Sequence, residues 1–241
     1  MRPLPWAACA ALALAGGAAA AQECRLALVL ALDVSSSVNE QEDRLQREGL
    51  AKALTEARVL EAILSGDPVA LYVFEWSGRS AQAAILDGWQ LLVDEADVVR
   101  VATAIAKSRR SHADLPTALG AALGHAATQL RDAPACRART IDVAGDGINN
   151  ESFGPALAYD TFPFEGVTVN ALIIGDLSAT QAGREEGAQL VAWFQTEVLR
   201  GPGAFSVVAE GYGDYARAMA AKLLRELELP AVSGTYPDHA G

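Results

Sequence analysis

The chain has 241 residues, a formal net charge of −11 and a hydrophobic share of 51%. This length suits one α/β domain, because domains commonly hold about 100–200 residues. The acidic balance and the lack of a basic cluster argue against a nucleic acid partner, since such partners are bound through a positively charged surface.

The first segment, MRPLPWAACAALALAGGAAAAQEC, has the form of a secretory signal peptide. Arg2 precedes an apolar centre, and small residues from Ala19 to Ala21 suit a cleavage site. The apolar centre is shorter than the roughly 20 residues that a membrane-spanning helix needs, and no other segment is a better candidate. We expect residues 1–21 to be removed, which leaves a soluble protein without a membrane span that is exported to the periplasm or the medium.

Three cysteines are present, and Cys9 lies in the expected signal peptide. Cys24 and Cys136 remain in an oxidising compartment, where two cysteines normally form a disulfide. A zinc site is the alternative, but neither a C-x-x-C motif nor paired histidines accompany them.

The segments that follow alternate between strand and helix patterns. Residues 25–33, RLALVLALD, form a near-continuous apolar run, as expected of a parallel strand covered on both faces. Further strands are predicted at 67–77, 138–146, 166–176 and 204–210, and helices at 39–64, 95–110, 115–132, 184–201 and 215–229. Asp87-Gly88, within 81–92, is a tight-turn signal.

This alternation predicts an α/β fold with a doubly wound, mostly parallel sheet flanked by helices. We expect one antiparallel edge strand. No internal repeat or long linker is visible, so residues 22–229 are predicted to form one domain and residues 230–241 a flexible tail. Ligands of such sheets bind at the carboxyl ends of the strands. Asp33 and Asp146 each end a predicted strand there.

The segment ALDVSSSVNEQE, residues 31–42, places three oxygen-bearing side chains after the first strand. Asp33, Ser35 and Ser37 are hard oxygen donors, which suit Mg²⁺ or Mn²⁺. Such an ion needs further ligands from other loops at the same edge, and Asp146 and Thr117 are the candidates. For the isolated motif, helix capping would be the preferred interpretation.

Taken together, these motifs resemble the von Willebrand factor type A (vWA) domain, and in detail a branch of secreted bacterial proteins of unknown function. Asp33, Ser35 and Ser37 match the D-x-S-x-S motif, Thr117 begins the T-x-x-G-x-A-L match, and Asp146 matches the last aspartate. The resemblance extends from the start of the mature chain to about residue 229. It includes the segments FEWSG, DVAGDGINN, GVTVNALIIG and RGPGAFSVVA. The chain departs from many members at Leu119, where they carry a second threonine.

The resemblance implies a metal-ion-dependent adhesion site (MIDAS) that binds Mg²⁺ or Mn²⁺. The hydroxyls of Ser35, Ser37 and Thr117 would coordinate directly, and the two aspartates directly or through water. An open position on the ion would then accept an Asp or Glu carboxylate of a protein partner, without enzymatic activity.

The same resemblance implies a disulfide between the two remaining cysteines. In the vWA fold, the first strand and the strand before Asp146 are parallel neighbours. Cys24 lies nine residues before Asp33, and Cys136 lies ten before Asp146, so both reach a similar height at the opposite edge. Neighbouring strands lie close enough for a disulfide.

Other functions remain open alternatives. AGDGINN is similar to a loop of haloacid-dehalogenase-like phosphohydrolases, with Asp33 as nucleophile. That family needs a second acid where Ser35 stands, and the final acid of its loop is Asn150 here. A purely structural domain is a third option, in which the ion is held by solvent or by Asp238 of the tail. GYGDYA, residues 211–216, matches a dinucleotide motif but has no following strand to complete the unit.

Three residues near the same edge are candidates for the rim of a partner-binding surface. They are Trp76, Arg110 and His112. Packing in the core is the commoner role for a residue such as Trp76.

Overall fold

The computed structural model describes residues 24–175 and 180–228. The expected signal peptide and the expected tail lie outside the described residues. The strands are β1 (Cys24–Asp33), β2 (Val69–Trp76), β3 (Gln82–Ala84), β4 (Gln90–Leu92), β5 (Cys136–Gly145), β6 (Val167–Gly175) and β7 (Ser206–Glu210). The helices are α1 (Glu40–Leu54), α2 (Ala57–Leu64), α3 (Glu95–Lys107), α4 (Leu119–Gln129), α5 (Pro155–Thr161), α6 (Gln181–Trp193) and α7 (Tyr215–Glu228), with a π-helical turn η1 (Phe194–Val198) and a 3-10 turn η2 (Tyr212–Asp214).

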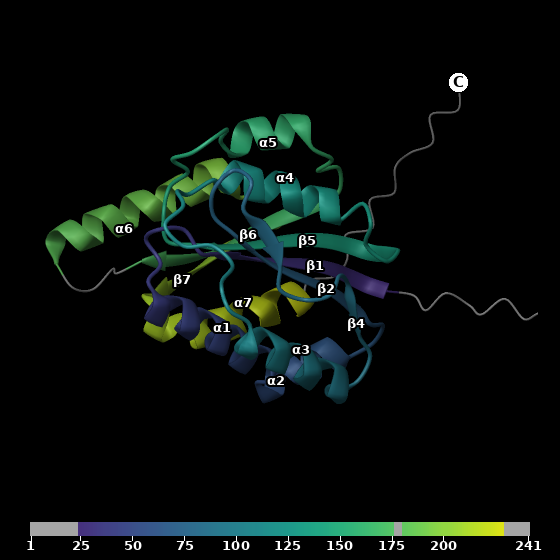
Figure 1. The fold of residues 1–241 in the computed structure, drawn as a ribbon. Helices are drawn as coiled ribbons and strands as arrows, with labels where there is room; N and C mark the ends of the chain where they lie inside the picture. Colours follow the sequence, from purple (N-terminus) through teal and green to yellow (C-terminus); the bar gives the residue numbers. More distant parts are fainter. Residues whose placement is uncertain (1–23, 176–179, 229–241) are drawn as a thin grey trace, which may run out of the picture.

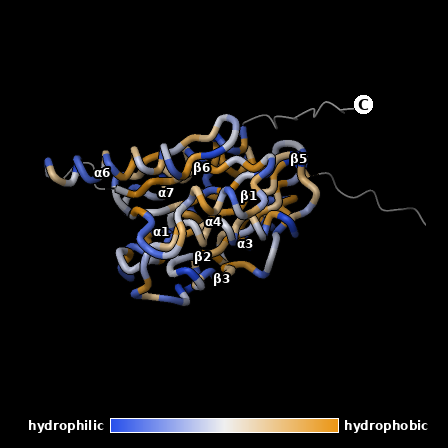
Figure 2. The backbone as a smooth tube through the Cα atoms, turned by 90° about the horizontal axis from the view of Figure 1, so that it is seen from above, coloured by the Kyte–Doolittle hydropathy of each residue, from blue (hydrophilic) through white to orange (hydrophobic). Residues whose placement is uncertain are grey.

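The strands form one sheet between two layers of helices, so the predicted α/β class is confirmed. Helices α1, α2, α3 and α7 cover one face, and α4, α5 and α6 cover the other (Figure 1). The side chains of β1 alternate between the two faces: Leu28 and Leu30 pack toward the first layer, and Ala27 and Val29 toward the second. This double burial explains why the β1 sequence is apolar without interruption. Hydropathy along the chain is shown in Figure 2.

The strand order is β3-β2-β1-β5-β6-β7, with β4 also pairing with β2. Strands β1, β2, β5, β6 and β7 run parallel, and both short strands, β3 and β4, pair antiparallel with β2 at one edge. From β1 the chain winds outward to β2, and from β5 it winds in the opposite direction to β6 and β7. The winding therefore reverses between β1 and β5, which is where such sheets form a binding crevice.

The register of the two central strands brings the cysteines together. Cys24 is paired with Cys136 across β1 and β5, and the two form the expected disulfide with an S–S distance of 2.04 Å. The bridge lies at the amino end of both strands. It therefore closes the edge of the sheet opposite to Asp33 and Asp146.

The helices differ from the sequence prediction in several places. The helix predicted over 184–201 is α6, which begins at Gln181 and ends at Trp193, followed by the π-helical turn η1 to Val198. The predicted helix 39–64 is two helices, because Thr55 ends α1 and the Glu56 side chain accepts a hydrogen bond at the start of α2. The helix predicted from residue 115 begins at Leu119. Helix α5 was not predicted, although Pro155 at its first turn is a helix-start signal.

A buried charged cluster ties α7 to the sheet. Lys222, which is fully buried, lies 2.7 Å from Asp142 Oδ2 on β5 and 2.6 Å from Glu226 Oε1. Asn170 of β6 also donates to Glu226 Oε1. Burial raises the pKa of Asp142 to about 7, and the positive charge of Lys222 opposes this rise.

No helix among the described residues is long and apolar enough to cross a membrane.

Candidate metal centre

The loop after β1 turns its hydroxyl groups back toward the end of the strand. The backbone N–H of Ser35 donates to Asp33 Oδ1 at 2.8 Å, and the N–H of Val38 donates to the Ser35 carbonyl. The hydroxyl oxygens of Ser35 and Ser37 lie 3.2 Å apart. Helix α1 then begins with a capping box between Asn39 and Glu42. The cap of α1 is thus Asn39, and the serines are left available for another role.

Thr117 joins this group from a different part of the chain. Its hydroxyl lies 3.3 Å from Ser35 Oγ. Asn150 holds it in place twice: the Asn150 side chain accepts from the Thr117 N–H at 2.9 Å, and the Asn150 N–H donates to the Thr117 carbonyl at 2.9 Å. The role of this asparagine was missed from the sequence, because the contact joins two segments that are far apart along the chain.

The start of α4 is held by the same 149–154 segment. Ala118, the N-cap residue, has no side-chain hydrogen bond, and Asn149 Oδ1 instead accepts from the Gly120 N–H at 3.1 Å. A Cβ at Gly120 would lie 2.1 Å from the carbonyl oxygen of Phe153. Only glycine allows this close approach, which gives a physical reason for the glycine in T-x-x-G.

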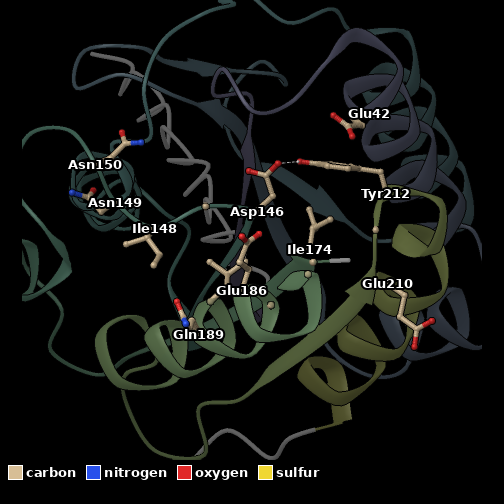
Figure 3. Close-up of a pocket in the computed structure, with 16 residues that line it drawn as sticks. Glu42, Asp146, Ile148, Asn149, Asn150, Ile174, Glu186, Gln189, Glu210 and Tyr212 are labelled. Atoms are coloured by element: carbon tan, nitrogen blue, oxygen red, sulfur yellow. Dashed lines mark hydrogen bonds between the residues drawn. The ribbon is translucent and has the colours of Figure 1, made fainter. Parts of the chain in front are cut away.

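Asp146 follows directly on β5 and completes the cluster. Its Oδ1 accepts a hydrogen bond from Ser37 Oγ at 2.7 Å, and its Oδ2 accepts one from the Tyr212 hydroxyl at 3.2 Å (Figure 3). The structure therefore brings all five predicted residues to one place at the carboxyl ends of β1 and β5. Tyr212, on η2, was missed, because the sequence GYGDYA indicated only a turn.

The electrostatics of this cluster favour a bound cation. Asp33 is fully buried, and its Oδ2 has no hydrogen-bond partner among the described residues. Burial, with a further contribution from Asp146, raises the pKa of Asp33 to about 7, while hydrogen bonds from Ser35 oppose the rise. Burial also raises the pKa of Asp146. A divalent cation would stabilise both carboxylates in their charged form.

The donor set fits Mg²⁺ or Mn²⁺ better than a softer metal. Two carboxylates and three hydroxyls are hard oxygen donors. The described residues contain no group of three or more His, Cys, Asp or Glu side chains that could hold a metal. Any ion in this part of the chain would therefore depend on hydroxyl oxygens as well as carboxylates.

The structure corrects one of the three candidate rim residues. Trp76 is fully buried and packs in the core beneath α4, so it cannot contact a partner at this surface. Arg110 is half-buried, and its guanidinium donates to the Val38 carbonyl at 2.6 Å. His112 is exposed. A role for these two residues in partner binding stays a prediction.

A comparison with known families gives one assignment. The sequence profile of a family described as "Protein of unknown function (DUF1194)" matches residues 23–231. No curated protein matches the chain.

Solved structures with the same fold include several vWA domains. Proximal thread matrix protein 1 from the mussel byssus is 14% identical, with a TM-score of 0.57 over 85% of this chain and 48% of that one. The von Willebrand factor type A protein from Catenulispora acidiphila is 13% identical, with a TM-score of 0.55 over 85% and 43%. The pilus adhesin SpaC from Lactobacillus rhamnosus GG is 15% identical, with a TM-score of 0.56 over 85% and 31%.

These similarities show a vWA-like fold. The chain spans less than half the length of each of those three chains. A further structure of the mussel protein, 13% identical with a TM-score of 0.55, has a zinc-occupied MIDAS motif.

Proposed function

The chain belongs to the DUF1194 family of proteins of unknown function, and we propose that its vWA-like domain is an exported, metal-dependent protein-binding module. It binds Mg²⁺ or Mn²⁺ at Asp33, Ser35, Ser37, Thr117 and Asp146. It then uses the ion to hold an Asp or Glu carboxylate of a protein partner.

The observation that carries this proposal is the buried carboxylate of Asp33 with one oxygen unpartnered. An unpaired buried charge is costly, and a cation at the neighbouring hydroxyls would compensate it. Ser35, Ser37 and Thr117 provide neutral ligands, and Asp146, whose Oδ1 lies 2.7 Å from Ser37 Oγ, provides the second carboxylate. With only two acidic ligands, the bound ion would keep the capacity to attract a further carboxylate.

The proposal of a protein partner is supported by the kinds of protein that share this fold. The similar structures include a thread matrix protein and a pilus adhesin, and one has a metal in its MIDAS motif. Export is supported by the form of residues 1–21 and by the Cys24–Cys136 disulfide, since disulfides persist in oxidising compartments.

The proposal is tested by asking whether a carboxylate reaches the bound ion. Protein loaded with Mn²⁺ enhances the relaxation of water protons through water on the ion. Millimolar N-acetylaspartate α-methylamide, which has one carboxylate, should lower this enhancement by displacing that water, whereas N-acetylasparagine α-methylamide, which has none, should not.

The matched variants are two threonine substitutions. Thr117→Ala should weaken Mn²⁺ binding, while Thr103→Ala, at an exposed position of α3, should not. An equal response to the acid and to the amide would contradict carboxylate binding, and equal Mn²⁺ affinity of the two variants would contradict the ligand set.

The phosphohydrolase alternative predicts that the protein hydrolyses phosphate esters, whereas a binding module does not. It requires Asp33 as nucleophile and a second acid at the position of Ser35, which lacks an acidic group. We expect no hydrolysis of p-nitrophenyl phosphate in Mg²⁺ above the background of the Asp33→Asn variant. Turnover that this variant abolishes would favour the enzyme instead.

A further inference from the structure

A pocket of about 920 Å³ adjoins the candidate metal centre (Figure 3). Asp146 and Tyr212, which hydrogen-bond to each other, both belong to its wall. The remaining wall comes from the start of α1, the loop after β5, the ends of β6 and β7, and α6. An ion at the metal centre would therefore lie at the side of a pocket that falls in the size range of known ligand sites.

The lining of the pocket combines an apolar part with carboxylates from separate elements. Ile148, Ile174 and Leu190 supply apolar surface, and Ile148 is 45% exposed. The acidic side chains come from four different elements: Glu42, Asp146, Glu186 and Glu210. None of the described residues that line the pocket is Lys, Arg or His.

Two of these carboxylates are free to bind a ligand. Glu186 and Glu210 are exposed, and neither side chain has a hydrogen bond or salt bridge within the described part of the chain. Arg217, whose charge is also stabilised by Glu210, already pairs with Asp214 at 2.6 Å. Glu42, by contrast, is used in the capping box of α1.

We propose that this pocket receives an arginine or lysine side chain from the same partner segment that gives its carboxylate to the ion. This inference rests on the proposed function and specifies the partner: a peptide with an acidic residue close to a basic one. The long aliphatic stem would lie on the isoleucine and leucine side chains, with the charged end among the carboxylates.

Charge complementarity excludes the other simple occupants. A purely acidic segment would bring its remaining negative charges against Glu186 and Glu210, and like charges across an interface disfavour a partner. An apolar side chain would take these carboxylates out of water without a partner for them, which is costly. A basic side chain beside the metal-bound acid avoids both penalties.

The test uses a series of synthetic fluorescent hexapeptides. Each peptide carries one aspartate and one arginine, and the number of residues between the two differs from peptide to peptide. Binding to the full mature chain is measured by fluorescence polarisation in Mg²⁺ and again with a chelator. Each peptide has two matched controls, one with arginine replaced by glutamine and one with aspartate replaced by asparagine. For at least one spacing, the arginine peptide should bind roughly tenfold more tightly than its glutamine control, because two carboxylates contact the cation.

The chain offers a matched pair of variants on one helix. Glu185 and Glu186 are adjacent exposed residues of α6, but only Glu186 lines the pocket. Glu186→Gln should reduce the preference for arginine two- to fivefold, and Glu186→Gln with Glu210→Gln should abolish it. Glu185→Gln, with the same change in net charge, should leave the preference intact.

The outcomes separate the inference from the function on which it rests. Equal affinity for arginine and glutamine peptides, with binding that still needs aspartate and Mg²⁺, would overturn the inference alone. Binding that ignores both the asparagine control and the chelator would overturn the proposed function. An arginine preference that Glu185→Gln and Glu186→Gln reduce equally, or no binding by any peptide, would also overturn the inference.

Discussion

Loss of the Cys24–Cys136 disulfide should destabilise the domain severely. The two cysteines are 112 residues apart in the sequence, so the bridge constrains nearly half of the chain in the unfolded state. In the chain-entropy description, a loop of this length corresponds to a stabilisation of about 5 kcal/mol at 25 °C. With a urea m value of roughly 2 kcal/mol/M, the unfolding midpoint should fall by about 2.5 M.

The assay is urea unfolding of the oxidised protein, of the same protein reduced, and of the Cys24→Ala/Cys136→Ala variant. Reduction breaks the link without changing side-chain volume, which matters because Cys24 is buried. The reduced protein and the variant should show similar losses. A loss below about 1 kcal/mol in both would refute the reasoning, because β1 and β5 would then stay together in the unfolded chain or the bridge would be absent from the protein in solution.

Two further predictions concern the α4 start and the buried charged cluster. Gly120→Ala should destabilise the domain by about 3 kcal/mol, since the new Cβ would meet the rigid Phe153 carbonyl. Gly124→Ala, which meets a movable aromatic ring, should cost less by urea unfolding; equal losses would contradict this account. The raised pKa of Asp142, about 7, means that stability is fully present below its unfolded pKa and is lost as pH rises through 7. The Asp142→Asn variant lacks this titration. When the pH is raised from 5 to 8, its free energy of unfolding, measured with urea at both pH values, should therefore rise by roughly 2 kcal/mol relative to that of the wild type. A fall relative to the wild type would contradict the raised pKa.

Several features of the fold could be predicted because their signals are local. A near-continuous apolar run identified β1 as a strand covered on both faces, and an aspartate at the end of each of the strands predicted at 25–33 and 138–146 indicated the binding edge. The division of the 39–64 helix was missed for a related reason. The apolar pattern continues across Thr55 and Glu56, so only the capping hydrogen bonds reveal the break.

The parts that could not be predicted depend on contacts between distant segments. Nothing in AGDGINN shows that its asparagines hold Thr117 and the α4 start, because that contact exists only in the folded chain. Trp76 was proposed for the rim, but it belongs to β2, which is buried on both faces. Such a strand lacks the alternation of polar and apolar residues that distinguishes exposed from buried side chains in a sequence. Tyr212 reaches Asp146 from a position 66 residues farther along the chain.

The central claim is that one divalent ion binds at the end of β1 and β5. Calorimetric titration of Mg²⁺ and Mn²⁺ into the mature protein, Asp146→Ala and the exposed-site control Asp87→Ala tests it most directly. We predict one saturable site in the wild type and in Asp87→Ala, and its loss in Asp146→Ala. Absence of binding in the wild type, or equal binding by all three proteins, would contradict the claim.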